Sequence, residues 1–137
     1  MIILAVDDDE EDFEFFFEAV KEVDNSIIVL KATNGHEALH MLENHMLMPD
    51  YIFLDINMPL MDGNACLREI RKNAKLKDIP VVMYSTTKNS GEIANYKEQG
   101  ARFLVKPYQF SKLVKSLSII LGYSDGDRSE FFFFFMV

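Results

Sequence analysis

Residues 51–59 read YIFLDINMP, and the rest of the chain can be organised around them. The apolar residues 51–54 stand between two aspartates, which predicts a short buried strand because the run is too brief for a helix. The strand ends on Asp55, and Pro59 stops any continuation. A carboxylate at the mouth of a buried strand is poorly solvated unless a positive group meets it. Asp55 is therefore a candidate functional residue, although such an aspartate often only caps the next turn.

Length and composition indicate one globular domain and exclude several classes of protein. The 137 residues are 49% hydrophobic and 26% charged, which is ordinary for a globular protein. A net charge of −8 without any basic run argues against a nucleic-acid partner. No apolar run approaches the ~20 residues of a membrane span, and the N-terminus lacks signal-peptide features. We therefore expect a cytoplasmic protein without a membrane partner, whose single cysteine, Cys66, forms no internal disulfide.

Further apolar runs predict four more strands, at residues 2–6, 27–30, 79–84 and 102–105. Apolar residues at helical spacing predict five helices, which follow the acidic block 7–12, follow Asn34-Gly35, begin at Gly63, lie around 91–99 and run from 110 to 121. Strands that alternate with helices imply a parallel sheet with helices on both faces. Right-handed crossovers leave few topologies, and the best known at this size is the flavodoxin-like doubly wound order 2-1-3-4-5.

The last fifteen residues have a different character from the domain, which we place at residues 1–122. Residues 124–130 resemble a linker, and residues 131–137 are consecutively apolar, with five phenylalanines in a row. An exposed segment of this kind would promote aggregation. We expect the tail to pack against the domain or across a dimer.

Polar residues follow four of the predicted strands, namely Asp7 and Asp8, Asp55, Ser85 and Lys106. Open parallel sheets bind ligands beyond the carboxyl ends of their strands. Converging carboxylates repel one another, so a divalent cation is their natural partner, and oxygen ligands suit Mg²⁺. With the metal bound, Asp55 can attack a phosphoryl group while Lys106 and Ser85 stabilise the transferring oxygens. Each residue alone has an ordinary explanation in a solvated helix start or loop, but their joint placement favours function.

These residues resemble the receiver domains of two-component response regulators, and the resemblance runs from Met1 to about Gly122. It is carried by VDD at 6–8, LDINMP at 54–59, MDG at 61–63, IPVV at 79–82 before Ser85, and KP at 106–107. It implies a phosphoprotein of a phosphorelay, with a sensor histidine kinase as phosphodonor. Such a domain catalyses only its own phosphorylation and dephosphorylation. The Ser-Thr-Thr sequence at 85–87 and the lack of an output domain resemble stand-alone regulators that serve bacterial phytochrome-type kinases.

The resemblance also assigns a role to each site residue. Around the metal it implies Asp55 as phosphoacceptor and ligand, Asp8 as direct ligand, Asp7 acting largely through water, and the backbone carbonyl of Asn57. Around the phosphoryl group it implies contacts from Ser85 and Lys106, with Asn57, Thr86 and Thr87 as neighbours. It further implies a cis bond between Lys106 and Pro107.

The resemblance places a conformational switch at Ser85 and Phe103. Phosphorylation is expected to draw Ser85 towards the site and to let Phe103 turn inward. Phe103 stands where the family often has tyrosine, so no hydroxyl is available there, and Thr86 replaces a smaller residue and is expected to slow water access. A downstream protein target or a second subunit would dock on the helix around 91–99, the strand 102–105 and the helix 110–121. A role as a phosphate sink without any target remains the alternative.

Two enzyme or carrier classes fit the sequence less well. A haloacid-dehalogenase-type phosphatase needs a second acid two residues after its nucleophile, and that position is Asn57, which cannot act as a general acid. A flavodoxin-like FMN carrier would place small hydroxyl residues after the first strand, where this chain has acids. The three histidines, His36, His40 and His45, lack a completing ligand set and are expected to be solvated, and Cys66 is expected to be a small buried hydrophobe.

Overall fold

The computed structural model describes residues 1–44 and 48–123. Its strands are β1 Ile2–Val6, β2 Ile28–Ala32, β3 Tyr51–Leu54, β4 Val81–Ser85 and β5 Arg102–Val105. Its helices are α1 Glu10–Val23, α2 Gly35–Asn44, α3 Gly63–Lys72, α4 Ser90–Glu98 and α5 Phe110–Ile120. All neighbouring strands pair in parallel, in the order β2-β1-β3-β4-β5. The predicted flavodoxin-like, doubly wound topology is therefore confirmed.

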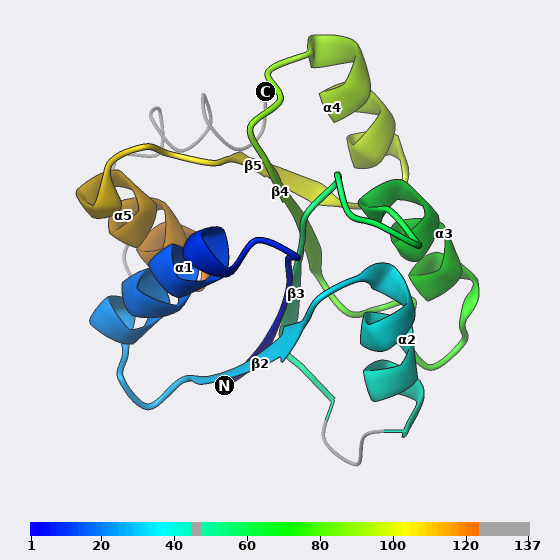
Figure 1. Cartoon of the computed structure of the whole chain (residues 1–137), viewed down its shortest axis with the longest axis horizontal. Coiled ribbons are helices and arrows are strands. Elements are labelled where there is room, and N and C mark those ends of the chain that lie inside the picture. Colours follow the sequence, from blue (N-terminus) through cyan, green and yellow to red (C-terminus); the bar gives the residue numbers. More distant parts are fainter. Residues whose placement is uncertain (45–47, 124–137) are drawn as a thin grey trace.

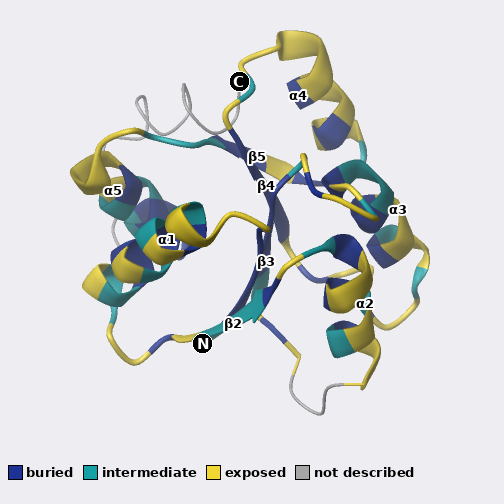
Figure 2. Cartoon of the chain, in the orientation of Figure 1, coloured by how far each residue is buried: buried dark blue, intermediate teal, exposed yellow. Residues whose placement is uncertain are grey.

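The helices cover both faces of the sheet. Helices α1 and α5 lie on one face, and α2, α3 and α4 lie on the other (Figure 1). Each face has its own apolar core, because alternate residues of a strand point to opposite sides. Phe53 packs with α1 and α5, whereas its neighbours Ile52 and Leu54 pack with α2, α3 and α4. The inner strands β1, β3 and β4 are accordingly buried almost throughout (Figure 2). The edge strands β2 and β5 are partly exposed, and most other exposed residues lie on the outer helix faces and in the loops.

The same alternation continues one residue beyond the strands and decides which way the polar residues point. Asp7, Asp55 and Lys106 each extend the ladder through a backbone hydrogen bond, to the carbonyls of residues 32, 6 and 85 respectively. They therefore lie in phase with the strand residues that face α1 and α5. Ser85 lies in phase with Met83, which faces the other helical layer.

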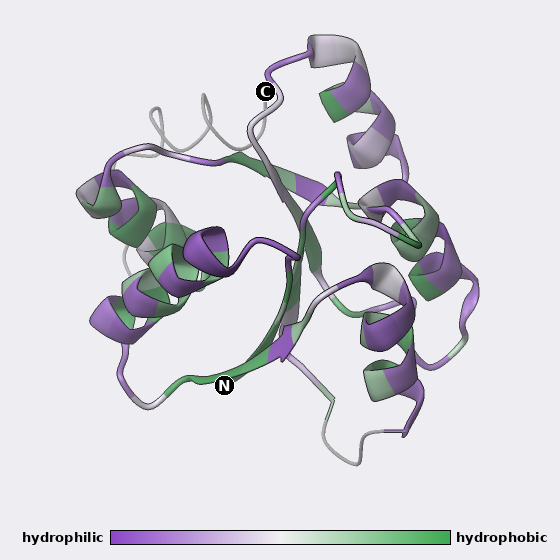
Figure 3. Ribbon diagram, viewed as in Figure 1, coloured by the Kyte–Doolittle hydropathy of each residue, from purple (hydrophilic) through white to green (hydrophobic). Residues whose placement is uncertain are grey.

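The helices begin where polar residues can cap them. In α1 the Asp9 carboxylate accepts a 3.0 Å hydrogen bond from the backbone N–H of Asp12, and the acids of the first turn suit the positive end of the helix dipole. In α3 the Asp62 carboxylate accepts a 2.9 Å hydrogen bond from the backbone N–H of Ala65. The outer faces of the helices are hydrophilic and the faces toward the sheet hydrophobic (Figure 3).

The loop between β3 and α3 is tightly folded against Asp55. The backbone N–H of Gly63 donates to the Ile56 carbonyl at 2.8 Å, and a Cβ at Gly63 would lie 2.2 Å from the Asp55 carbonyl oxygen. Only glycine allows this approach. The loop also holds Leu60 at a φ of 67°, with the N–H of Met61 bonded to the Pro59 carbonyl at 2.8 Å. This packing fixes the chain directly after Asp55.

Some predicted boundaries were wrong by one or two residues. The second strand was expected at 27–30, but Ile27 belongs to a turn in which its N–H donates to the Asp24 carbonyl, and residues 31 and 32 extend the ladder instead. The fourth strand begins at residue 81 rather than 79. The expectations for His45 and for the apolar tail concern residues outside the described ranges. Among the helices described, none is long and apolar enough to cross a membrane.

Candidate phosphoryl-acceptor and metal site

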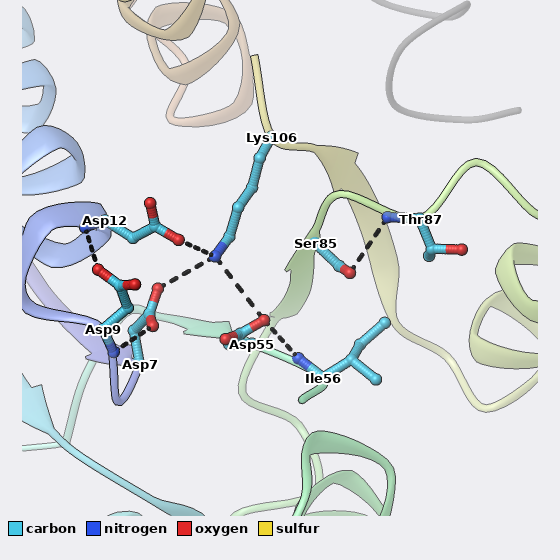
Figure 4. A network of polar contacts seen from close by, with 8 residues as sticks. All are labelled: Asp7, Asp9, Asp12, Asp55, Ile56, Ser85, Thr87 and Lys106. Atoms are coloured by element: carbon cyan, nitrogen blue, oxygen red, sulfur yellow. Dashed lines mark hydrogen bonds and ion pairs between the residues drawn. The ribbon is translucent and has the colours of Figure 1, made fainter. Parts of the chain in front are cut away.

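Two carboxylates and one ammonium, those of Asp7, Asp55 and Lys106, converge at the carboxyl ends of the strands, as the sequence predicts (Figure 4). The Lys106 Nζ lies 3.2 Å from Asp7 Oδ2 and 3.8 Å from Asp55 Oδ1. Asp7, Asp55 and Ser85 are the buried polar residues among those described. The Asp55 Oδ1 also accepts a 2.8 Å hydrogen bond from the N–H of Ile56, and Asp7 Oδ1 accepts one from Asp9 at 2.9 Å. Both carboxylates are thus held in fixed directions.

The acids form a candidate site for a divalent cation. Asp7, Asp8 and Asp55 each offer a carboxylate oxygen, and these oxygens lie within 4.8 Å of one another. Asp8 is exposed while the other two are buried, so the cluster is anchored in the protein and open to water on one side. An all-carboxylate donor set with room for water fits a hard divalent cation such as Mg²⁺ or Mn²⁺.

Burial dominates the electrostatics of the two inner carboxyls. It raises the pKa of Asp55 to about 6, against the opposing effect of the Lys106 charge, and the nearby Asp7 charge raises it further. Burial likewise raises the pKa of Asp7. Aromatic side chains keep water from the inner side of Asp7, which lines a small cavity together with Phe16, Phe53 and Tyr84. A cation here would relieve the cost of ionising both acids.

Lys106 has a partner that the sequence analysis did not single out. Its Nζ lies 2.9 Å from Asp12 Oδ2, nearer than to either Asp7 or Asp55. Burial lowers the pKa of Lys106, but the hydrogen bond to Asp12 and the charges of Asp55 and Asp7 outweigh it, so the pKa is raised. The ammonium also lies 5.1 Å from the centroid of the Tyr84 ring. Asp12 was visible only as one member of the acidic block 7–12, and nothing in the sequence set it apart.

Ser85 is buried at the end of β4 and is tied to the following loop. Its Oγ accepts a 3.3 Å hydrogen bond from the N–H of Thr87, whose own hydroxyl donates to Glu92 at 2.8 Å in the first turn of α4. Thr86 and Asn57 are exposed beside the site. The loop residues therefore connect the Ser85 hydroxyl to α4 through an unbroken set of hydrogen bonds.

One expectation about the site needs correction. None of the described peptide bonds is cis, so the Lys106–Pro107 bond is trans. A trans bond suffices, because Lys106 leaves β5 in phase with the strand and already reaches the carboxylates. Phe103 is only 2% exposed and packs in the core beneath α4. The side chain of Phe103 already faces inward here, and its movement on phosphorylation stays a prediction.

The residues set aside in the sequence analysis lie away from the site. Cys66 is fully buried in the core between α2 and α3, where burial raises the pKa of its thiol to about 12 and keeps it protonated. His36 and His40 are exposed on α2. Within the described part of the chain, neither histidine belongs to the group of possible metal ligands.

Residues 3–118 match the model of the response regulator receiver domain. The chain is 33% identical over 122 residues to the response regulator Rcp1 of Synechocystis, covering 83% of this chain and 82% of Rcp1. It is 35% identical over 131 residues to the sensor histidine kinase CheAY of Helicobacter pylori, covering 93% of this chain but only 16% of that protein.

Solved structures of receiver domains superimpose closely on the chain. The Mn²⁺-bound form of Rcp1 has a TM-score of 0.77 at 28% identity and covers 89% of this chain and 92% of its own. The phosphorylated cyanobacterial phytochrome response regulator RcpA has a TM-score of 0.79 at 28% identity, and the match covers 90% of this chain and 95% of RcpA. The similarity to phytochrome response regulators, expected from the sequence, is thus confirmed. With the family model spanning most of its length, the chain belongs to the response regulator receiver domain family.

Proposed function

We propose that this receiver domain takes a phosphoryl group from the phosphohistidine of a sensor histidine kinase onto Asp55 in a Mg²⁺-dependent reaction, and that the phosphorylated form binds a protein partner. The observation that carries the proposal is the convergence of Asp7, Asp8, Asp55 and Lys106 at the ends of three strands. Asp55 is buried, belongs to the acidic cluster and lies at the end of the central strand β3, 3.8 Å from the Lys106 ammonium. It is the residue at which a bound metal and a fixed ammonium act on the same incoming phosphoryl group.

The proposed transfer is a displacement at phosphorus. An oxygen of the ionised Asp55 carboxylate forms the new P–O bond as the P–N bond to the kinase imidazole breaks, which gives an acyl phosphate and returns the electron pair to the imidazole nitrogen. Asp7, Asp8 and Asp55, together with the proposed carbonyl of Asn57, would hold Mg²⁺, which offsets the negative charge of the phosphoryl oxygens. Lys106 would hydrogen-bond to one of these oxygens and Ser85 to another.

The domain acts in this proposal on its own carboxylate alone. Hydrolysis of the acyl phosphate by water ends the signal, and the exposed Thr86 beside the site is proposed to restrict that water. Ser85, Thr87 and Glu92 link the phosphoryl site to α4. We therefore propose the surface of α4, β5 and α5 as the docking face for the partner or for a second copy of the domain.

Phosphorylation by acetyl phosphate with Mg²⁺, followed by intact-protein mass spectrometry, tests the proposal. One phosphoryl group per chain is expected, stable in acid and labile in base, and Asp55→Asn should abolish it. Asp62→Asn is a matched control, because Asp62 lies in the same loop and asparagine caps a helix equally well. Equal labelling of Asp55→Asn would overturn the assignment.

Phosphotransfer profiling against the histidine kinases of the source organism then separates signalling from a phosphate sink, which would return the group to a kinase and bind no target.

A further inference from the structure

The ammonium of Lys106 is shared unequally among three carboxylates from separate elements. Its nitrogen is 2.9 Å from Asp12 Oδ2 on α1, 3.2 Å from Asp7 Oδ2 after β1, and 3.8 Å from Asp55 Oδ1 after β3. The first two are hydrogen bonds, whereas the third is an ion pair without a hydrogen bond. Two of the three N–H donors of Lys106 are therefore engaged by Asp12 and Asp7, and neither is engaged by the proposed phosphoacceptor.

Asp12 is well placed to control this sharing. Its backbone is fixed at the third position of α1, where its N–H is held by the capping carboxylate of Asp9 at 3.0 Å. Its side chain is 49% exposed, whereas that of Lys106 is 11% exposed, so the pair lies at the rim of the site. Asp12 lies outside the group of possible metal ligands, and its carboxylate reaches the site through its hydrogen bond to Lys106.

We propose that Asp12 is a positioning residue that holds the Lys106 ammonium on the α1 side and so limits its access to a phosphoryl group on Asp55. The inference rests on the proposed function. A hydrogen bond from Lys106 to a phosphoryl oxygen needs a separation of about 2.7–2.9 Å. The ammonium must therefore move from Asp12 toward Asp55 during the reaction. Loss of the Asp12 charge weakens the shorter of the two hydrogen bonds that oppose this movement.

Kinetics of phosphorylation test the proposal. Asp12→Asn, which keeps the shape of the side chain, is expected to raise the rate of Asp55 labelling by acetyl phosphate and Mg²⁺ about two- to fivefold, the range of an exposed ion pair. Asp12→Glu keeps the charge and is expected to restore the wild-type rate. Glu11→Gln is the matched control, because it removes one exposed charge from the same helical turn. An equal acceleration in Glu11→Gln would show general charge repulsion and overturn the role of Asp12.

A double-mutant cycle with Lys106→Met shows whether the effect acts through the lysine. In that background Asp12→Asn is expected to change the rate less than 1.5-fold, which is roughly the lower end of the range for an exposed pair. A full acceleration without Lys106 would overturn the proposal. The ¹⁵N resonance of the Lys106 ammonium gives a readout without phosphodonor, and it should shift in Asp12→Asn but not in Glu11→Gln. Unlabelled wild type would refute the proposed function, whereas labelled wild type with identical rates in Asp12→Asn would refute only this inference.

Discussion

The ring of Phe103 packs against the ring of Tyr96, with centroids 6.1 Å apart and planes inclined by 37°. The contact joins β5 to α4 within the core of the α2, α3 and α4 layer. Any displacement of Phe103 therefore displaces Tyr96 and with it α4. A switch that uses Phe103 must move this pair together rather than turn one ring from solvent into the core.

Truncation of Phe103 is expected to be costly. Phe103→Ala should lower the free energy of unfolding by about 3–5 kcal/mol, because it leaves a cavity next to Tyr96. Urea unfolding followed by circular dichroism measures the change. Tyr108→Ala serves as control, since Tyr108 is 91% exposed and its loss should change stability by no more than about 0.5 kcal/mol. Similar small effects in both variants would contradict the burial of Phe103.

The stability of the protein should depend on pH through Asp55. The pKa of Asp55 is raised from 3.8 to about 6 in the folded protein, chiefly by burial. Between these values the folded state binds more protons than the unfolded state, so the free energy of unfolding falls as pH rises from about 4 to about 6. Asp55→Asn cannot ionise and escapes this loss. In EDTA it should be more stable than wild type at pH 7, by up to about 3 kcal/mol, with the difference vanishing near pH 4.

Urea denaturation of both proteins in steps from pH 4 to 8 measures this difference. Glu43→Gln, which removes an exposed carboxylate on α2, should not reproduce the pattern. A difference between Asp55→Asn and wild type that is constant across the range would show that the pKa of Asp55 is not raised.

Divalent cations should stabilise the wild-type protein. Binding to the folded state alone adds about 2.7 kcal/mol at a hundredfold excess of free ion over Kd. Differential scanning calorimetry with and without MgCl₂ should therefore show a higher Tm with the ion. Asp8→Asn is expected to lose most of this shift, because Asp8 is the exposed member of the acidic cluster and has no described role in the core. CaCl₂ and MnCl₂ would rank the preference of the site.

Arg71 is predicted to stabilise the fold at the far end of the sheet. Its guanidinium donates to the carbonyls of Lys77, Ile79, Gln99 and Gly100 at 3.1–3.2 Å. Arg71→Ala removes the partner of the part-buried carbonyls of Ile79 and Gln99, whereas water can reach those of Lys77 and Gly100, and it should destabilise the protein by about 2–3 kcal/mol. Arg71→Lys should rescue little, since an ammonium cannot reach four acceptors on two segments. Arg68→Ala, on the exposed face of the same helix, is the control for helix propensity.

The fold and most of the site could be predicted because they depend on strands alone. Continuous apolar runs mark the five strands, and the residue after each strand continues its alternation. Counting by two from Ala5 and Phe53 places Asp7 and Asp55 on the same side of the sheet. The rule does not extend to loops, which is why boundaries near Ile27 and Pro80 were misplaced.

Asp12 could not be predicted because its position depends on how α1 packs against the sheet. Any of the acids in the first turn of α1 has the charge to meet Lys106, and the rotation of the helix about its axis selects among them. That rotation is set by the burial of Phe13, Phe16 and Val20. The bond at Pro107 was misassigned for a related reason, since the direction of the chain after β5 depends on tertiary contacts rather than on the two residues themselves.

The alternation of side chains along the strands divides the site between the two helical layers. Asp55 and Lys106 belong with α1 and α5, whereas Ser85 and Phe103 belong with α4. A phosphoryl group that hydrogen-bonds to both Lys106 and Ser85 would therefore connect the two helical layers at the edge of the sheet. The phosphoryl charge would be added on the side of α1 and α5, and the conformational change would occur on the side of α4. Helix α4 would respond to the phosphoryl group through Ser85 although it lies on the other side of the sheet from Asp55 and Lys106.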